Sequence, residues 1–238
     1  MVLPNPTACA EAAADRVVGA ARNAIRRRGR FCVALTGGST PRATYDLLAS
    51  PPRVAAVDWS RVEFFWGDER AVPPDHHDSN YGAARAQLLD RLPGISAESV
   101  HRMPADAPDL DAAAERYEIE LARAFRVAPG GAPPAFDLVW LGMGADGHTA
   151  SLFPGSTGLA ERRRWVVATW APSIAAWRMT LTQPLINAAR AALFVVTGPE
   201  KAAAVRSIAS GSRELPAARI RARSTIFLVD TRAAGRAA

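Results

Sequence analysis

Short, mainly apolar runs, separated by loops and by segments with helical composition, recur along this 238-residue chain. Uninterrupted apolar runs of this length are typical of parallel strands that are covered on both faces. Alternation of such strands with helices predicts a mostly parallel sheet with helices on both sides. The runs that we expect to form strands are Phe31–Leu35, Val62–Trp66, Phe136–Leu141, Ala192–Thr197 and Ser224–Val229.

The segments between these runs divide into helices, two further strands and loops. A long polar loop is expected from the end of the Val62–Trp66 strand through Asp78, and the further strands are expected near Trp165–Thr169 and Arg178–Thr182. The length suits one α/β domain that covers residues 1–238. The expected helices are Ala8–Arg28 (ending at Gly29), Pro41–Ala49, about Tyr81–Leu92, Leu110–Phe125, about Pro184–Arg190 and Glu200–Ala209.

The net charge of +6 is carried almost entirely by arginine, because Lys201 is the only lysine. The arginines are scattered, and the two runs at 26–28 and 162–164 lack the interleaved aromatic residues that single-strand binders use. We therefore expect no nucleic-acid partner and only a modest attraction for an anionic metabolite.

The two cysteines do not predict a disulfide framework, since Cys32 lies inside an apolar run and Cys9 lies in a helical segment. No apolar stretch is long enough to span a bilayer, and the first residues lack the charged and apolar regions of a signal peptide. We expect a cytoplasmic protein without a membrane partner, acting as a monomer.

The stretch Phe136–Gly155 carries the strongest functional signal. It runs from an apolar strand into glycines and then presents Asp146 and His148 at the strand's carboxyl end, where open α/β sheets bind ligands. Histidine is well suited to proton transfer near neutral pH, so His148 is a catalytic candidate. The pattern G-x-G-x-x-G at 142–147 is typical of dinucleotide sites, but Pro154 would cut the required helix short. We therefore expect no NAD and no other cofactor.

Three more loops should reach the same edge of the sheet. Thr36-Gly-Gly-Ser-Thr-Pro41 combines glycines with a helix start and suits a phosphate group, although an ordinary capped helix explains it about as well. Trp66-Gly-Asp-Glu-Arg70 places three charges at a strand's end, which is unfavourable unless they are exposed or meet a polar ligand. Lys201, in a helix's first turn, opposes the helix dipole, so it is either a ligand for an anion or a solvent-exposed lysine. Arg178 is a fifth contributor or an edge-strand arginine.

Two groups of histidines are expected to lie outside the site. Asp75-His76-His77-Asp78 contains metal-ligating side chains, but it lacks the spacing of a closed zinc site, and we interpret it as a surface loop. We expect His101 to have no acidic or basic company in the fold and to be structural. We predict no metal site.

Six motifs in one order resemble the 6-phosphogluconolactonase family, which belongs to a superfamily with glucosamine-6-phosphate deaminases. Together they cover most of the chain, from about Leu35 to Ala204, and Asp146-Gly-His-Thr-Ala-Ser-Leu-Phe-Pro-Gly155 is the most specific of them. The resemblance implies a three-layer αβα fold with a Rossmann-like sheet. The motifs are Leu35–Pro41, Phe65–Arg70, Asp78–Tyr81, Leu141–Gly155, Arg178–Thr182 and Gly198–Lys201.

The resemblance also implies hydrolysis of 6-phospho-D-glucono-1,5-lactone to 6-phospho-D-gluconate, in the oxidative pentose phosphate pathway. His148 would be the general base that activates water, with Asp146 supporting it, and Arg70 would stabilise the negative charge on the carbonyl oxygen. The residues that would grip the 6-phosphate are Gly37, Gly38, Ser39, Arg178 and Lys201. Asp68 and Asn80 match motif positions near the sugar.

Two alternatives remain open. The deaminase loop reads Asp-Gly-His-Ile-Ala-Phe-Asn-Glu-Pro-Gly, and its glutamate corresponds to Phe153, which cannot move a proton. A sugar-phosphate sensor would share the fold, but such sensors carry a DNA-binding helix-turn-helix, whereas the residues before Phe31 offer about one helix.

Overall fold

The computed structural model describes residues 1–38 and 40–236, and its largest element is a six-stranded sheet. All neighbouring strands of this sheet pair in parallel, which confirms the expected mostly parallel sheet. The strands lie in the order β1 (Val2–Leu3), β9 (Thr225–Asp230), β8 (Ala192–Val196), β5 (Leu138–Leu141), β2 (Phe31–Leu35) and β3 (Val62–Trp66).

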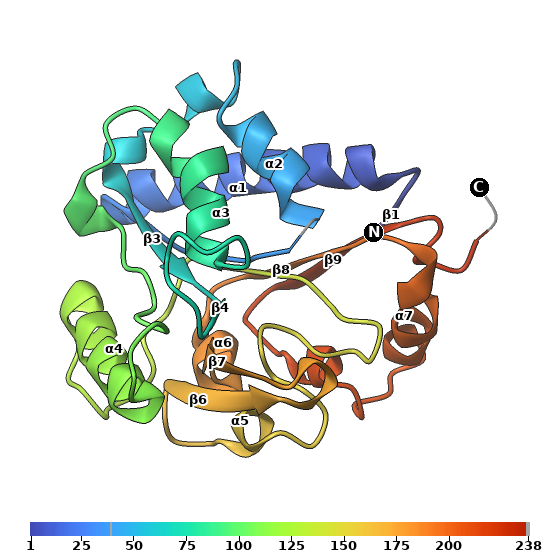
Figure 1. Cartoon of the computed structure of the whole chain (residues 1–238). Coiled ribbons are helices and arrows are strands. Elements are labelled where there is room, and N and C mark those ends of the chain that lie inside the picture. The colour runs from blue at the N-terminus through green and yellow to red at the C-terminus, as the bar shows by residue number, and fades with distance from the viewer. Residues whose placement is uncertain (39, 237–238) are drawn as a thin grey trace.

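Helices α1 (Pro6–Arg28) and α2 (Thr40–Leu48) cover one face of this sheet (Figure 1). The buried stripe of α1 consists largely of alanines, which let the helix approach the strands closely. Asn5 caps its first turn, and Gly29 ends it with φ of 77°, a left-handed conformation that glycine adopts without strain. The predicted end of this helix at Gly29 is confirmed.

A second, three-stranded sheet lies on the side of the molecule away from α1 and α2 (Figure 1). It shows that two expectations from the sequence were wrong. Its antiparallel strands are β4 (Asp68–Arg70), β7 (Ala176–Leu181) and β6 (Val166–Ala171). The segment after Trp66 is therefore not a continuous loop, because Asp68–Arg70 pairs with β7. The strands expected near 165 and 178 exist, but they do not belong to the parallel sheet.

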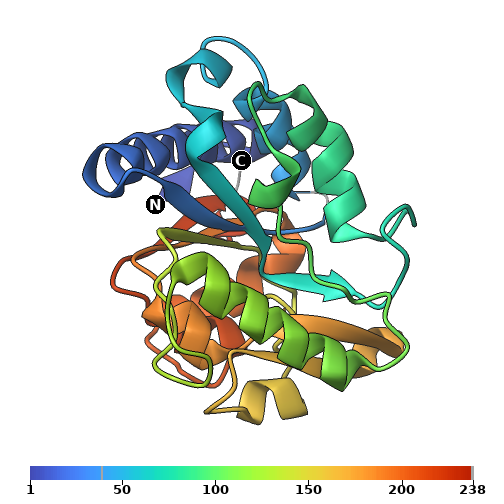
Figure 2. The ribbon, with the colours of Figure 1, turned by 90° about the vertical axis from the view of Figure 1, so that its left-hand side faces the viewer.

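Helix α4 (Leu110–Phe125) packs against β6, as Figure 2 shows from the side. Helices α3 and α7 are shorter than expected: α3 (Asn80–Gln87) gives way to the 3-10 turn Leu89–Arg91, and α7 (Ala202–Ala209) follows the 3-10 turn Pro199–Lys201. Lys201 thus lies just before α7, not within it. The remaining helices are α5 (Thr157–Ala160) and α6 (Gln183–Ala188), and the remaining 3-10 turns are Val54–Ala56, Trp59–Arg61, Ala97–Ser99, Pro172–Ile174 and Pro216–Arg219.

The core includes large aromatic side chains between the layers. Trp66, Trp140 and Trp165 are among the largest fully buried residues, and Tyr45 of α2 meets Trp140 of β5 edge-on at 5.3 Å between ring centroids.

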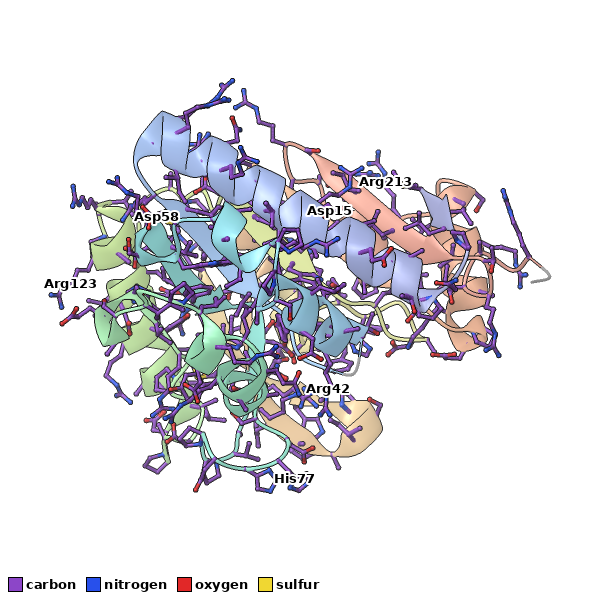
Figure 3. All side chains as sticks on the ribbon, turned by 90° about the horizontal axis from the view of Figure 1, so that it is seen from above. Asp15, Arg42, Asp58, His77, Arg123 and Arg213 are labelled. Carbon is purple, nitrogen blue, oxygen red and sulfur yellow. The ribbon has the colours of Figure 1, made fainter. Side chains whose placement is uncertain are left out.

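Within residues 1–38 and 40–236, no helix has both the length and the apolarity needed to cross a membrane. Arg42, Arg123 and Arg213 lie on separate parts of the molecule (Figure 3), so these arginines form no common patch.

Candidate active site

A cavity of about 520 Å³ opens where the parallel strands end. Its walls come from the segments that follow β2, β5, β8 and β9. The second sheet adds Asp68 and Arg70 of β4 and Arg178 of β7, and α3 adds Asn80. The expected convergence of loops is therefore present in the structure, although β4 and β7 approach from a separate sheet. The predicted site residues that line the cavity are Gly37, Gly38, Asp68, Arg70, Asn80, His148, Arg178 and Lys201.

Asp146 and His148 form a close pair in the turn after β5. The Asp146 carboxylate lies 2.6 Å from Nδ1 of His148 and also accepts the backbone N–H of His148 at 3.1 Å. Burial alone would raise the pKa of Asp146, but these hydrogen bonds outweigh it and hold the pKa below its usual value. The ring of Phe153 lies against His148, with 4.3 Å between centroids. Because Nδ1 faces the carboxylate, Nε2 is the ring nitrogen left to act on a ligand.

This pair fits only because residue 144 has no side chain. A Cβ on Gly144 would lie 2.1 Å from Nδ1 of His148 and 2.5 Å from the Asp146 carboxylate. The backbone N–H of Gly144 donates to the carbonyl of His148 at 2.9 Å, which closes the turn. The glycine therefore allows the turn to fold tightly around the pair.

Two arginines face each other at the cavity wall. Arg70 of β4 is directly opposite Arg178 of β7, and a carboxylate oxygen of Asp68 lies 3.7 Å from Nη1 of Arg178. Burial lowers the pKa of Arg178; Asp68 opposes this shift, and the positive charge of Arg70 adds to it. Nη1 of Arg70 donates to the backbone carbonyl of Asp78, while Nε of both arginines is buried without a hydrogen-bond partner among the described residues. This arrangement suits an anionic ligand.

Glu69 and Asn80 make several hydrogen bonds within this wall. Glu69 is 3% exposed and accepts the N–H groups of Asn80 and Tyr81, both at 2.7 Å, so it satisfies the start of α3. Its pKa is raised because burial outweighs these hydrogen bonds. The Asn80 amide donates to the Asp68 carbonyl at 2.9 Å, and a Cβ on Gly37 would overlap the Asn80 side chain.

Lys201 reaches the cavity from the 3-10 turn that follows β8, and its nearest acid is Glu200, at 3.9 Å. The sequence reasoning missed two neighbours that also line the cavity, Asp230 and Arg232. Asp230 is fully buried and accepts the N–H groups of Gly198 and Ala233, at 3.1 and 2.8 Å. It thereby joins the loop of Lys201 to that of Arg232. Asp230 and Arg232 could have been identified from the sequence, because they directly follow the last predicted strand, Ser224–Val229. Ser39 lies outside the described residues.

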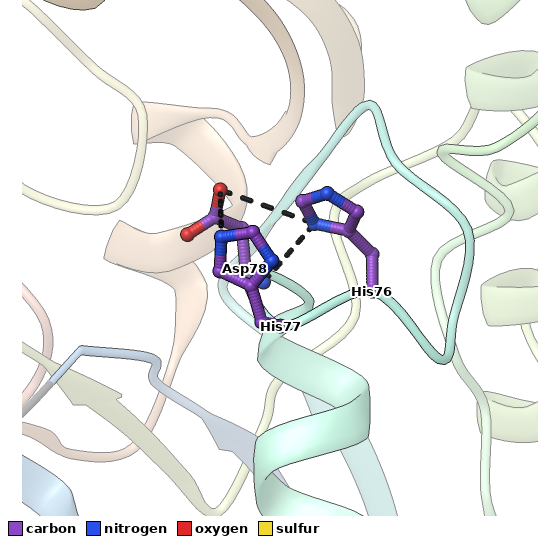
Figure 4. A group of neighbouring side chains, drawn as sticks. All are labelled: His76, His77 and Asp78. Carbon is purple, nitrogen blue, oxygen red and sulfur yellow. Dashed lines mark hydrogen bonds and ion pairs between the residues drawn. The ribbon is translucent and has the colours of Figure 1, made fainter.

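His76, His77 and Asp78 gather in the loop after β4, with their ligand atoms within 4.8 Å of one another (Figure 4). The backbone N–H of Asp78 donates to Nδ1 of His76 at 3.1 Å, and the His77 side chain is 82% exposed and points outward (Figure 3). None of these three side chains lines the cavity. The segment is a surface loop, as expected.

The expectation that His101 lacks acidic neighbours is wrong in three dimensions. Its ring nitrogens lie 3.0 Å from Glu63 and 2.9 Å from Glu120, and its ring stacks on Phe65 at 4.3 Å. Burial alone would lower the pKa of His101. The hydrogen bonds to Glu120 and Glu63 outweigh this effect and raise the pKa to about 9. His101 lies outside the cavity and joins β3 to α4.

Known proteins resemble this chain in both sequence and fold. The pattern of the family described as glucosamine-6-phosphate isomerases/6-phosphogluconolactonase matches residues 4–228. The chain belongs to this family. It is 41% identical to the 6-phosphogluconolactonase of Nostoc sp. over 213 residues, which cover 90% of this chain and 85% of that protein.

Other members give the same result. The 6-phosphogluconolactonase of Streptomyces coelicolor is 40% identical over 233 residues, covering 94% of this chain and 89% of that protein. The solved structure of 6-phosphogluconolactonase from Trypanosoma cruzi superposes with a TM-score of 0.85 at 31% identity, covering 99% of this chain and 95% of that chain. The three-layer α/β fold expected from the sequence is thus the fold of the family.

Proposed function

We propose that this protein hydrolyses 6-phospho-D-glucono-1,5-lactone to 6-phospho-D-gluconate, a step of the oxidative pentose phosphate pathway. The relatives named above support the activity, and the cavity offers the groups that the reaction needs. Those groups are a base for water, a donor for the oxygen that becomes negative, and cations for the phosphate.

His148 is the general base in this proposal. The Asp146 carboxylate at 2.6 Å favours the form of the ring with its proton on Nδ1, which leaves the lone pair of Nε2 for a water molecule. Removal of a proton from that water drives its attack on the lactone carbonyl carbon. The protonated ring then returns the proton to the ring oxygen as the C–O bond breaks, so one residue serves as base and as acid.

Arg70 stabilises the charge that develops on the carbonyl oxygen. A well-placed donor contributes roughly 3–4 kcal/mol to such a transition state. Its hydrogen bond to the Asp78 carbonyl fixes the guanidinium at the wall, while Nε has no hydrogen-bond partner among the described residues. In the lactone the carbonyl carbon and C5, which bears the phosphorylated C6, are both bonded to the ring oxygen. Arg70 and its neighbour Arg178 can therefore reach the two charged ends of one substrate.

The phosphate is held by Arg178, Lys201 and the loop of Gly37, Gly38 and Ser39. Arg178 of β7 and Lys201 of the turn after β8 line the same cavity, and the glycine backbone lies next to the start of α2, where free N–H groups favour an anion. Asp68 lies beside Arg178, and the Asn80 side chain lies against Gly37 of this loop. In this arrangement they orient the cations and bind the sugar hydroxyl groups.

The observation that carries the proposal is that His148, which is paired with Asp146 and packed against Phe153, lines the same cavity as two facing arginines. The matching deaminase position bears a glutamate that helps to open an amino sugar. Phe153 has no group that exchanges protons, so it favours lactone hydrolysis over deamination.

A coupled assay with freshly prepared lactone tests the proposal, provided that it is faster than spontaneous hydrolysis. We expect turnover of the phosphorylated lactone and no ammonia from glucosamine 6-phosphate. Ammonia release at a comparable rate would refute the assignment. Tight binding of sugar phosphates without turnover of either compound would instead indicate a sensor.

A further inference from the structure

The carboxylate of Asp68 contacts two different donors through one oxygen. Oδ2 accepts the hydroxyl of Ser151 at 2.6 Å, whereas Nη1 of Arg178 lies 3.7 Å from the same oxygen. Asn80 donates weakly to the other oxygen, at 3.3 Å. The short bond therefore goes to the neutral hydroxyl, and the ion pair with the arginine is held beyond hydrogen-bonding distance.

The backbone places Ser151 firmly for this contact. Its N–H donates to Oγ1 of Thr180, the residue directly opposite Asp68 across the β4–β7 pair, at 3.2 Å. The preceding residue, Ala150, has φ of 47°, a left-handed conformation that is uncommon for a residue with a side chain. Backbone held in this way persists only where its surroundings fix it. Ser151 is fully buried, so its hydroxyl has little freedom to turn elsewhere.

We propose that Ser151 is a positioning residue, whose hydroxyl holds Asp68 back from Arg178 and so keeps the guanidinium free for the phosphate of the substrate. The inference rests on the proposed function, because it concerns the phosphate subsite of the same cavity. It also links the turn that carries His148 to the arginine that holds the far end of the substrate.

The physical reason is competition for one carboxylate. Without the Ser151 hydroxyl, the strongest donor within reach of Oδ2 is Arg178, and a charge-assisted hydrogen bond at about 2.8 Å would replace the present 3.7 Å contact. Arg178 would then exchange its contact with the phosphate for a contact with Asp68. The affinity for phosphorylated ligands should fall, while the affinity for the same ligand without phosphate should not change.

Calorimetric titration of Ser151→Ala with 6-phosphogluconate and with gluconate tests this step. We expect Kd for 6-phosphogluconate to rise about 10-fold, which corresponds to one weakened charge-assisted contact, and Kd for gluconate to stay unchanged. Thr149→Val is the matched control. Thr149 lies in the same turn, is 1% exposed and donates one hydrogen bond, to the Gly142 carbonyl, but it does not contact Asp68. Its loss should leave both Kd values within about 2-fold.

A double-mutant comparison separates this mechanism from a general loss of structure. In an Asp68→Asn background no carboxylate remains to capture Arg178, so Ser151→Ala should have no further effect on Kd for 6-phosphogluconate. An equal loss in both backgrounds, or an equal loss for gluconate, would overturn the proposal. If Ser151→Ala does not fold, Ser151→Cys gives the same comparison with a weaker donor. Binding is measured without turnover, so a failure of the lactonase assay would be distinguishable from a failure here.

Discussion

Arg70 and Arg178 lie directly opposite each other on the antiparallel strands β4 and β7, and both line the same cavity. Side chains in such a pair are roughly 5 Å apart at Cβ, where like charges repel. One carboxylate, Asp68, is close enough to Arg178 to offset part of this repulsion. The pair is therefore poised to bind negative charge, and the proposed function divides that charge between a phosphate and a developing oxyanion.

This division predicts different kinetics for the two arginines. Arg70→Gln should lower kcat by about 100-fold on both phosphorylated and unphosphorylated gluconolactone, because it acts on the transition state. Arg178→Gln should raise KM for the phosphorylated lactone by about 10-fold and change kcat little. Steady-state assays on both lactones measure the two effects. The same kinetic change in both variants would mean that the two arginines bind one and the same group.

The proposed base predicts a selective loss of turnover in His148→Ala. We expect kcat to fall at least roughly 100-fold, because no other group of the Asp146 turn can take a proton from water near neutral pH. Circular dichroism should show an unchanged fold, since His148 is partly exposed. His77→Ala is the matched control, because His77 is highly exposed and lies outside the cavity. A folded His148→Ala enzyme with nearly full activity would exclude the proposed base.

The sequence predicted the buried framework closely. The strands Phe31–Leu35 and Val62–Trp66 are found with the expected bounds. An uninterrupted run of apolar residues is stable mainly where both of its faces are buried, as in a parallel sheet covered by helices. The Asp146–His148 pair could also be predicted from the sequence, because both residues lie in one short turn.

Features that depend on distant partners were not predictable in this way. β4 consists of three charged residues, and only its pairing with β7 makes it a strand. The partners of His101 come from β3 and α4, and neither Glu63 nor Glu120 is near it in sequence. Such contacts are determined by the packing of elements that are distant in sequence, and no local sequence pattern predicts them.

Gly144→Ala should disable the Asp146–His148 pair without removing either residue. A Cβ at 144 would overlap the His148 ring, so the ring must turn away from the carboxylate. We expect kcat to fall by at least about 10-fold, as for a misplaced catalytic group. Gly142→Ala is the matched control, because a Cβ at that position meets nothing within 4 Å. Equal losses in the two variants would show that the loop tolerates no side chain at all.

Lys201→Ala tests the second cation of the proposed phosphate site. Loss of one charge-assisted contact should raise KM for the phosphorylated lactone by about 10-fold, with kcat nearly unchanged. Unphosphorylated gluconolactone should be much less affected, because it has nothing for the lysine to hold. Arg213→Ala removes an exposed cation away from the cavity and should change neither constant (Figure 3). Equal losses on both substrates would place the phosphate elsewhere.

His101 should make the stability of the protein depend on pH above neutrality. Its pKa is about 9 in the folded protein, against 6.5 as the ordinary value, so the folded state binds the proton more tightly. The stabilisation is complete below about pH 6.5 and is lost as the pH rises towards 9, and should amount to about 1–3 kcal/mol. Urea unfolding of the protein and of His101→Gln at pH 6.5 and pH 10 measures it. The difference in unfolding free energy between them should shrink at pH 10; a constant difference would mean that His101 acts through packing on Phe65 alone.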